Sequence, residues 1–270
     1  MKKTLLKLGA IALILIIPAI NLFVNFNREA PDVSTSQTDI SALKKLSDGK
    51  VSAVEKKIEK TEAQKQEQIY KKKLLLERAQ NREKLLEQVK EGKTTYRQIF
   101  SDTLIVGDSL MNGLEIYDIL DSANMITKVG ASLYHLDDNI KKIISYSPKV
   151  LILHYGVNMI EDRDYFIDNF INMYTDCINK IKKGTPETKI VVSGMFPVSS
   201  KGIENEPVLA NCPKYEKKIR EMCSLLGVTY LDNTETIQDG SGYYDLDGIH
   251  VKRDFYTDVW LVYVATELGL

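Results

Sequence analysis

The stretch Thr103–Leu110 reads TLIVGDSL, a short apolar run that ends abruptly in glycine, aspartate and serine. An unbroken run of aliphatic and β-branched residues is typical of a strand that is buried on both faces of a parallel sheet. Gly107 permits a tight turn, and a helix-like pattern begins soon after it. The stretch therefore predicts a buried strand whose carboxyl end presents Ser109 on a strand-to-helix turn.

The same pattern recurs along the chain from about Ile99 onward. Further apolar runs, which predict strands, occupy 125–129, 150–155, 190–193 and 228–231. Amphipathic stretches, which predict helices, lie near 110–120, 135–146, 163–183, 213–226 and 254–268. Alternation of this kind indicates a parallel sheet covered by helices on both faces. In such sheets the functional groups lie in loops at the carboxyl ends of the strands.

A second polar motif, DGIH, lies near the C-terminus and places Asp247 three residues before His250. At this spacing the carboxylate can accept the Nδ1–H of the imidazole, which leaves Nε2 free for the hydroxyl of Ser109. Asp245 is a second candidate carboxylate, but the D-x-x-H spacing favours Asp247. The two motifs predict a nucleophile, a general base and an orienting carboxylate at one sheet edge.

Two further candidate hydrogen-bond donors follow predicted strands. Gly130 follows the second strand, and the sequence GVN, which ends at Asn158, follows the third. The N–H groups of Ser109 and Gly130 and the side-chain amide of Asn158 are candidate donors to the oxyanion of an ester's tetrahedral intermediate. Taken separately, Ser109 and Asn158 also read as helix caps and Gly130 as a simple turn. Their coincidence at one sheet edge favours a catalytic site.

The four motifs are GDSL at 107–110, Gly130, GVN at 156–158 and DGIH at 247–250. Together they resemble the conserved blocks of the SGNH hydrolases, also called GDSL esterases, and the resemblance covers roughly residues 100–270. The resemblance implies a flavodoxin-like three-layer α/β/α sandwich with a five-stranded parallel sheet in the order 2-1-3-4-5. It implies that Ser109 is the nucleophile, that His250 is the general base, and that Asp247 is the carboxylate that orients the His250 imidazole. The implied oxyanion donors are Ser109, Gly130 and Asn158. One departure is Met159, where many members carry aspartate, and it concerns the shape of this loop and the substrate preference.

Other chemically active side chains read as structural. His135 falls in a predicted helix and His154 inside the third predicted strand. The three cysteines, Cys177, Cys212 and Cys223, form no metal-ligand pattern and are expected to be buried thiols. A Cys212–Cys223 disulfide is an alternative that the sequence leaves open. No metal site and no cofactor is expected.

The N-terminal segment 1–26 carries a membrane signal. Lys2, Lys3 and Lys7 precede an apolar run from Leu8 to Val24. A basic start followed by an apolar stretch directs a chain to a membrane, and the lysine end stays in the cytoplasm. No small-residue cleavage motif follows the run, which favours a retained single-pass anchor over a cleaved signal peptide. The catalytic domain, residues 99–270, is then expected outside the membrane, or secreted if cleavage occurs.

Two segments connect this signal to the domain. Residues 27–49 are polar and are expected to form a flexible leader. Residues 50–92 are predicted to form a charged helical stalk, because no glycine or proline occurs between Lys50 and Glu91. Ser47 and Asp48 are candidate caps near its start. A heptad pattern fits the ends of the stalk but fails in the middle. A solvated spacer is therefore favoured over self-association through 50–92, and packing on the domain or binding to a membrane surface are further alternatives.

The composition limits the partners. The chain has 270 residues and a formal net charge of −1, which argues against nucleic acid as a partner. The expected function is hydrolysis of an acyl ester, with acetyl the favoured group, on a cell-wall or extracellular polysaccharide. Two alternatives are an O-acetyltransferase that uses the same triad and a non-catalytic surface domain with a vestigial site. Location and the family analogy alone suggest the glycan substrate.

Overall fold

The computed structural model describes residues 37–270, with side chains described from residue 60 onward. The predicted membrane segment 1–26 lies outside the described residues. Within the described part, no helix combines the length and apolar character that a bilayer crossing requires. The chain divides between Lys71 and Lys72 into two compact units, and the second contains the whole sheet.

A five-stranded parallel sheet forms the middle layer of the second unit, in the order β2-β1-β3-β4-β5. Its strands are β1 (Thr103–Gly107), β2 (Met125–Thr127), β3 (Val150–His154), β4 (Lys189–Ser193) and β5 (Thr229–Leu231). Gly107 pairs with Thr127 on one side and with His154 on the other, so the three strand ends lie level. The predicted strands, their parallel pairing and the implied strand order are confirmed.

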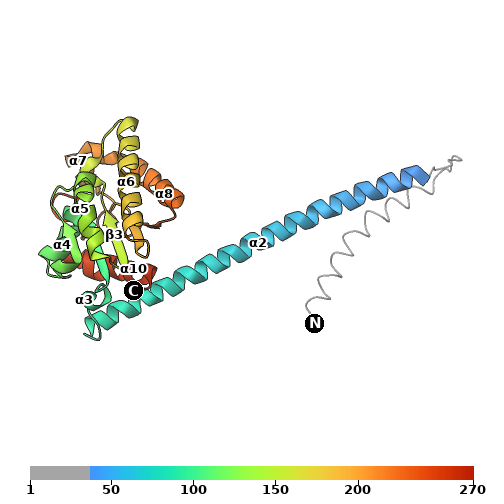
Figure 1. The fold of residues 1–270 in the computed structure, drawn as a ribbon. Helices are drawn as coiled ribbons and strands as arrows, with labels where there is room; N and C mark the ends of the chain where they lie inside the picture. The colour runs from blue at the N-terminus through green and yellow to red at the C-terminus, as the bar shows by residue number, and fades with distance from the viewer. Residues whose placement is uncertain (1–36) are drawn as a thin grey trace. The chain divides into compact units, whose positions relative to one another are not determined.

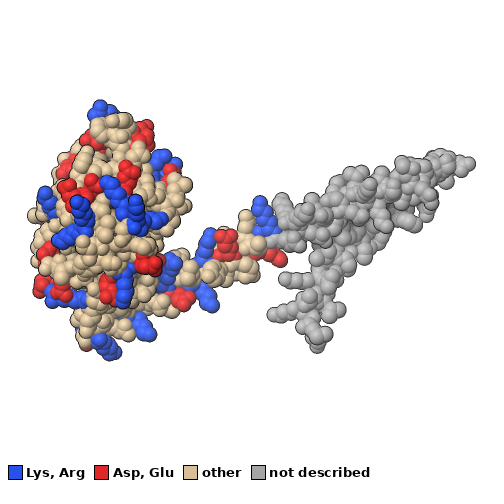
Figure 2. Space-filling model, viewed as in Figure 1, with Lys and Arg blue, Asp and Glu red and all other residues tan. Residues whose placement is uncertain are grey.

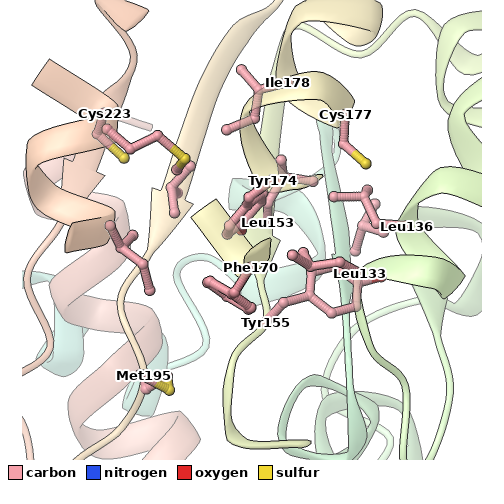
Figure 3. Close-up of a cluster of buried hydrophobic side chains, with 14 of the residues drawn as sticks. Leu133, Leu136, Leu153, Tyr155, Phe170, Tyr174, Cys177, Ile178, Met195 and Cys223 are labelled. Carbon is pink, nitrogen blue, oxygen red and sulfur yellow. The ribbon is translucent and has the colours of Figure 1, made fainter. Parts of the chain in front are cut away.

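One face of the sheet is covered by three amphipathic helices (Figure 1). They are α5 (Leu133–Tyr146), α6 (Asp164–Gly184) and α8 (Cys212–Leu226). Alternate strand residues such as Leu104 and Leu153 point into this layer. Figure 3 shows Phe170 and Tyr174 of α6 among the buried side chains that meet there. The three cysteines are buried free thiols on α6 and α8, so the alternative of a Cys212–Cys223 disulfide is wrong.

The opposite face carries α4 (Ser109–Ile116) and the C-terminal helix, which completes the three-layer sandwich. The C-terminal helix consists of α9 (Arg253–Phe255), the π-helical turn η4 (Tyr256–Trp260) and α10 (Leu261–Leu268). Strand residues Ile105 and Ile152 point to this side. The short elements are α3 (Tyr96–Ile99), α7 (Ser200–Asn205), η1 (Ser122–Asn124), η2 (Val157–Met159) and η3 (Pro207–Asn211).

The helix that precedes the sheet, α2, spans Gln37–Lys90 and begins earlier than predicted. The expectation of a flexible leader over 27–49 is wrong from Gln37 onward, and Ser47 and Asp48 lie within the helix rather than at its start. A glycine inside a helix costs only about 1 kcal/mol, which the strong helix formers on both sides of Gly49 offset. The predicted stop at Gly92 is confirmed.

Gly92 ends α2 through a well-defined cap. Its φ is +73°, the left-handed conformation that glycine adopts without strain. The N–H of Gly92 donates to Val89 O at 3.0 Å, and the N–H of Lys93 donates to Gln88 O at 2.9 Å. These two bonds make up a Schellman motif, which satisfies carbonyls at the helix end.

The last turns of α2 pack onto the sheet domain. Leu85, Leu86 and Val89 are half-buried against the core that contains the C-terminal helix. Arg82 donates to Glu267 at 2.8 Å, and Arg78 lies 2.9 Å from the same carboxylate. The interpretation of 50–92 as a solvated spacer is therefore wrong for this part of the helix. Leu86 and Val89, which fit the heptad at this end of the helix, pack on the globular domain.

Charged side chains of both signs lie interspersed over the face of the sheet domain drawn in Figure 2. The described part of α2 carries the same mixture, including the pair Glu67–Lys71 at 2.6 Å. Exposed pairs of this kind contribute little to stability. The surface in view has no large field of a single sign, which is the feature that would attract a polyanion.

Candidate active site

Ser109 is the first residue of α4, directly after the strand-to-helix turn. At Gly107 a Cβ would lie 2.6 Å from Met111 Cγ and 2.8 Å from His154 O, so this turn has no room for a side chain. N–H groups in the first helical turn have no helical acceptor, and the helix dipole favours negative charge beside them. The turn therefore places the Ser109 hydroxyl where an oxyanion would be stabilised.

Asp108, which the sequence interpretation left without a role, caps this helix. Its Oδ1 accepts the N–H of Leu110 at 3.0 Å, so the reading in which Ser109 caps the helix is wrong. Asp108 is fully buried, and burial raises its pKa to about 7, against the opposing influences of the Leu110 N–H and of His250. Aspartate is a preferred N-cap residue, which is the signal that identifies this role. Because Asp108 takes over the cap, the Ser109 hydroxyl is free for another partner.

His250, which lies near the C-terminus, is hydrogen-bonded to Ser109. The Ser109 Oγ lies 2.9 Å from His250 Nε2, and His250 Nδ1 lies 2.6 Å from Asp247 Oδ2. When Nδ1 carries the proton and donates it to the carboxylate, Nε2 is the acceptor for the serine hydroxyl. The structure thus joins the three predicted triad residues in one hydrogen-bonded chain.

Asp247 is held as an ionised acceptor. Its Oδ1 accepts the N–H groups of Ile249 and His250, both at 2.9 Å. Burial alone raises the pKa of Asp247, but these hydrogen bonds and the His250 side chain outweigh it and lower the pKa below its usual range. Asp245 instead shapes the loop, because its N–H donates to His250 O at 2.8 Å. The structure therefore pairs His250 with Asp247 and not with Asp245.

The loop that carries Asp247 and His250 is hydrogen-bonded to both ends of α7, through Ser199 and Asn205. The N–H and the hydroxyl of Ser199 both donate to Gly248 O, at 3.0 and 2.8 Å. Gly248 has φ +76°, and a Cβ there would lie 2.2 Å from Ser199 Oγ. Asn205 Nδ2 donates to Asp247 O at 3.1 Å. Sequence reasoning missed Ser199 and Asn205, because no local motif links them to a loop so far along the chain.

The two remaining oxyanion candidates lie on loops that contact each other. Gly130 is exposed and has φ +69°, which a residue with a side chain would adopt only under strain. Asn158, also exposed, lies on η2 after β3 and donates from Nδ2 to Ala131 O at 2.9 Å. An amide nitrogen carries two hydrogens, so this bond leaves one for a ligand. The contact places the Asn158 amide beside the Gly130 turn.

Met159 has a structural task in this sequence. The N–H of Leu133, the first residue of α5, donates to Met159 Sδ at 3.3 Å. The loop after β3 is therefore coupled to the N-terminus of α5, where a first-turn N–H otherwise lacks an acceptor. With methionine at this position the loop contacts α5, while Asn158 lies beside the Gly130 turn.

The other histidines have structural partners. His135 Nδ1 lies 2.9 Å from the Tyr155 hydroxyl, and His154 Nδ1 lies 3.2 Å from Ser193 Oγ. Burial lowers the pKa of His154 to about 3, so this ring stays neutral in the core. Among the described residues, no group of three or more His, Cys, Asp or Glu side chains could hold a metal ion.

Comparison with known proteins gives matches to solved structures only, because no family model and no curated protein matches the chain. A GDSL-like lipase from Bacteroides thetaiotaomicron VPI-5482 is 12% identical, with 62% of this chain and 88% of that chain covered and a TM-score of 0.48. A putative platelet activating factor from Streptococcus pneumonia is 16% identical, with 75% and 97% covered and a TM-score of 0.49. An acetyl xylan esterase, AlAXEase, is 17% identical, with 62% and 99% covered and a TM-score of 0.45. At such identities the activities in these names belong to those proteins.

Proposed function

We propose that this chain is a serine ester hydrolase of the SGNH type that works through an acyl-serine intermediate. The observation that carries the proposal is the hydrogen-bonded chain from Asp247 through His250 to Ser109, whose distances are 2.6 and 2.9 Å. The nucleophile lies at a helix N-terminus, and two loops with candidate oxyanion donors follow the neighbouring strands. This arrangement suits acyl transfer better than any other chemistry, because the general base, its orienting carboxylate and the nucleophile are already in hydrogen-bond contact.

In the first half of the reaction, Ser109 Oγ attacks the ester carbonyl carbon while His250 Nε2 takes the hydroxyl proton. The ionised Asp247 stabilises the imidazolium that forms. The N–H groups of Ser109 and Gly130 and the Asn158 amide donate to the carbonyl oxygen as it becomes negative. When the tetrahedral intermediate collapses, His250 gives its proton to the leaving alcohol, and the acyl group remains on Ser109.

In the second half, water takes the place of the alcohol. His250 removes a proton from the water, which attacks the acyl-Ser109 carbonyl carbon through a second tetrahedral intermediate. Collapse returns the proton to Ser109 Oγ and releases the carboxylic acid. Each step uses side chains and N–H groups of this chain together with water.

The substrate is proposed to be a short acyl ester, with acetyl favoured, carried on a cell-wall or extracellular polysaccharide. Gly130 and Asn158 are exposed, and the Asp247 and His250 side chains are 43% and 44% exposed. An open site of this kind lets an ester group approach while it is attached to a large polymer. The expected extracytoplasmic location would bring the domain to such polymers.

The test is acetate release from a panel of acetylated polysaccharides by the purified protein, with the Ser109→Ala variant as the blank. Release by the wild type and not by the variant supports the hydrolase. If free acetate stays at the blank level but an added sugar acceptor becomes acetylated, the chain is an O-acetyltransferase with the same triad. If the wild type gives neither product and small activated esters are also untouched, the proposed chemistry is wrong.

Asn158→Ala is expected to lower kcat on a small acetate ester by roughly 100-fold, with a smaller change in KM, because one preorganised oxyanion donor is lost. Asn139→Ala is the matched control, since the Asn139 amide donates to His135 O within α5 at 2.8 Å. The measurement is steady-state kinetics together with the melting temperature. If Asn158→Ala lowers only the melting temperature and keeps full kcat, Asn158 is a structural residue of its loop.

The catalytic domain is further proposed to face the outside of the cell membrane. The support is the sequence of the segment 1–26, with Lys2, Lys3 and Lys7 before the apolar run. Protease added to intact cells that express the full chain should remove the domain. Protection until the membrane is breached would contradict this orientation. A mature N-terminus downstream of Val24 would instead indicate a secreted protein.

A further inference from the structure

The backbone of Leu110, the residue after the proposed nucleophile, is held from both sides by buried side chains. Its N–H donates to Asp108 Oδ1 at 3.0 Å, and its carbonyl oxygen accepts the hydroxyl of Tyr256. Asp108 and Tyr256 are 0% and 1% exposed. The Asp108 bond is a local helix cap, whereas the Tyr256 bond comes from the C-terminal helix and joins residues far apart in sequence. The second bond ties the backbone of the first turn of α4 to the C-terminal helix, while the Asn112 amide ties the same turn to Thr127 of β2 at 3.1 Å.

Tyr256 begins the π-helical turn η4, which interrupts the C-terminal helix between α9 and α10. A π-helical turn contains one extra residue, changes the direction of side chains before it relative to those after it, and is frequent at functional sites. The other end of this turn is also fixed in the core. Trp260 Nε1 donates to Asn233 Oδ1 at 3.3 Å, and the Trp260 ring lies 5.7 Å from that of Phe196. The turn is therefore anchored at Trp260 while Tyr256 reaches α4.

The surface of α4 leaves room for the phenol. At Gly113, four residues after Ser109, a Cβ would lie 2.5 Å from the Tyr256 hydroxyl oxygen and 2.9 Å from Cζ. Glycine is unfavourable inside a helix, so the space it leaves for Tyr256 gives a reason for its presence here. Burial raises the pKa of Tyr256 well above its usual value, which keeps the hydroxyl protonated as a donor.

We propose that Tyr256 is a positioning residue, which fixes the first turn of α4 and thereby sets Ser109 Oγ and N–H against His250 and the oxyanion. The inference rests on the proposed role of Ser109 as nucleophile. Small displacements of a reacting group reduce rate strongly because the near-attack geometry is lost. Substrate binding at the open site does not involve the buried phenol. Loss of its hydroxyl should therefore lower kcat and leave KM nearly unchanged.

The experiment compares Tyr256→Phe with Tyr96→Phe. Tyr96 is a matched control, because it is also buried and its hydroxyl donates to a backbone carbonyl of the same π-helical turn, that of Thr257. That bond does not reach α4. Both variants keep the aromatic ring and lose one hydroxyl. The measurements are kcat and KM on 4-nitrophenyl acetate, and the rate at which a fluorophosphonate probe labels Ser109.

For Tyr256→Phe we expect kcat and the labelling rate to fall about tenfold, with KM within about twofold of the wild type. Tyr96→Phe should keep the kcat and labelling rate of the wild type. Wild-type rates in Tyr256→Phe would overturn the inference, and so would an equal loss in both variants, because that would indicate a purely structural helix. A wild-type protein that neither hydrolyses esters nor labels would instead overturn the proposed function, and this inference with it.

A second variant applies if Tyr256→Phe fails to fold. Gly113→Ala places a methyl group against the phenol, which must then move because the distance is shorter than any normal contact. The same loss of about tenfold in labelling rate is expected while Tyr256 itself is retained. A folded Gly113→Ala protein that labels at the wild-type rate would contradict the positioning role.

Discussion

Replacement of Ser109 by alanine is expected to lower the turnover of a small activated acetate ester by about 10⁴-fold or more, while the domain stays folded. The reason is that the hydroxyl is the proposed nucleophile, and the remaining His250 and oxyanion donors cannot form an acyl intermediate without it. The folded state should tolerate the change. Ser109 is half-buried, its hydroxyl is hydrogen-bonded to the His250 ring, and the helix cap is supplied by Asp108.

The measurement is the steady-state rate together with the melting temperature of each variant. Ser132→Ala is a suitable control, because Ser132 precedes α5 near the same sheet edge and its side chain makes no capping bond. The control should keep wild-type turnover and the Ser109 variant should not. If Ser109→Ala retained near-wild-type turnover, the hydrolysis would come from another group, and Ser109 would be only the first residue of α4.

The sheet could be predicted from sequence because its central strands, β1 and β3, are buried along their whole length. Runs such as that of Leu104–Val106 carry no polar residue that would expose one side, and each glycine after a run marks the turn to the next helix. The proposed triad could be predicted for a related reason. The pairing of Asp247 with His250 depends on local spacing, and parallel strands bring their carboxyl ends to one edge whatever lies between them. The family resemblance added the strand order.

The parts that escaped prediction depend on contacts between distant segments. Tyr256 reaches α4, and Ser199 reaches the Gly248 carbonyl, through backbone acceptors that have no sequence signature. Asp108 was overlooked for a different reason. Either Asp108 or Ser109 can cap a helix at this junction, and only the backbone geometry decides which of them does.

At the N-terminal end of α2, local capping residues did not determine where the helix begins. Ser47, Asp48 and Gly49 together look like a helix start, yet they lie inside a helix that begins at Gln37. Capping residues only offer an alternative to continuing the helix, and leucine, lysine and alanine before and after them favour continuation. The signal at Gly92 succeeded because a left-handed glycine and the two hydrogen bonds of the Schellman motif actively end the helix.

The packing of α2 on the sheet domain leads to a measurable expectation for truncation. A chain that begins at Thr94 should melt roughly 6 to 12 °C below one that begins at Lys72. The shorter chain loses Leu85, Leu86 and Val89, each half-buried and each contributing about 1 kcal/mol. For a domain of this size, 1 kcal/mol corresponds to about 2–4 °C in melting temperature. The ion pairs of Arg78 and Arg82 with Glu267 are partly exposed and add less.

The start at Thr94 keeps Thr95, which caps α3 together with Gln98, so the comparison isolates the loss of α2. None of the removed side chains contacts Ser109, Asp247 or His250, and turnover per folded molecule at 20 °C should therefore stay within about twofold. Equal melting temperatures for the two chains would mean that the last turns of α2 are a spacer that only rests on the domain. A tenfold loss of turnover at a temperature where the shorter chain is folded would mean that α2 also orders the active site. A lower melting temperature with unchanged turnover is the expected result. The apolar contacts of α2 stabilise the layer that contains the C-terminal helix, and they involve neither Ser109 nor its partners Asp247 and His250.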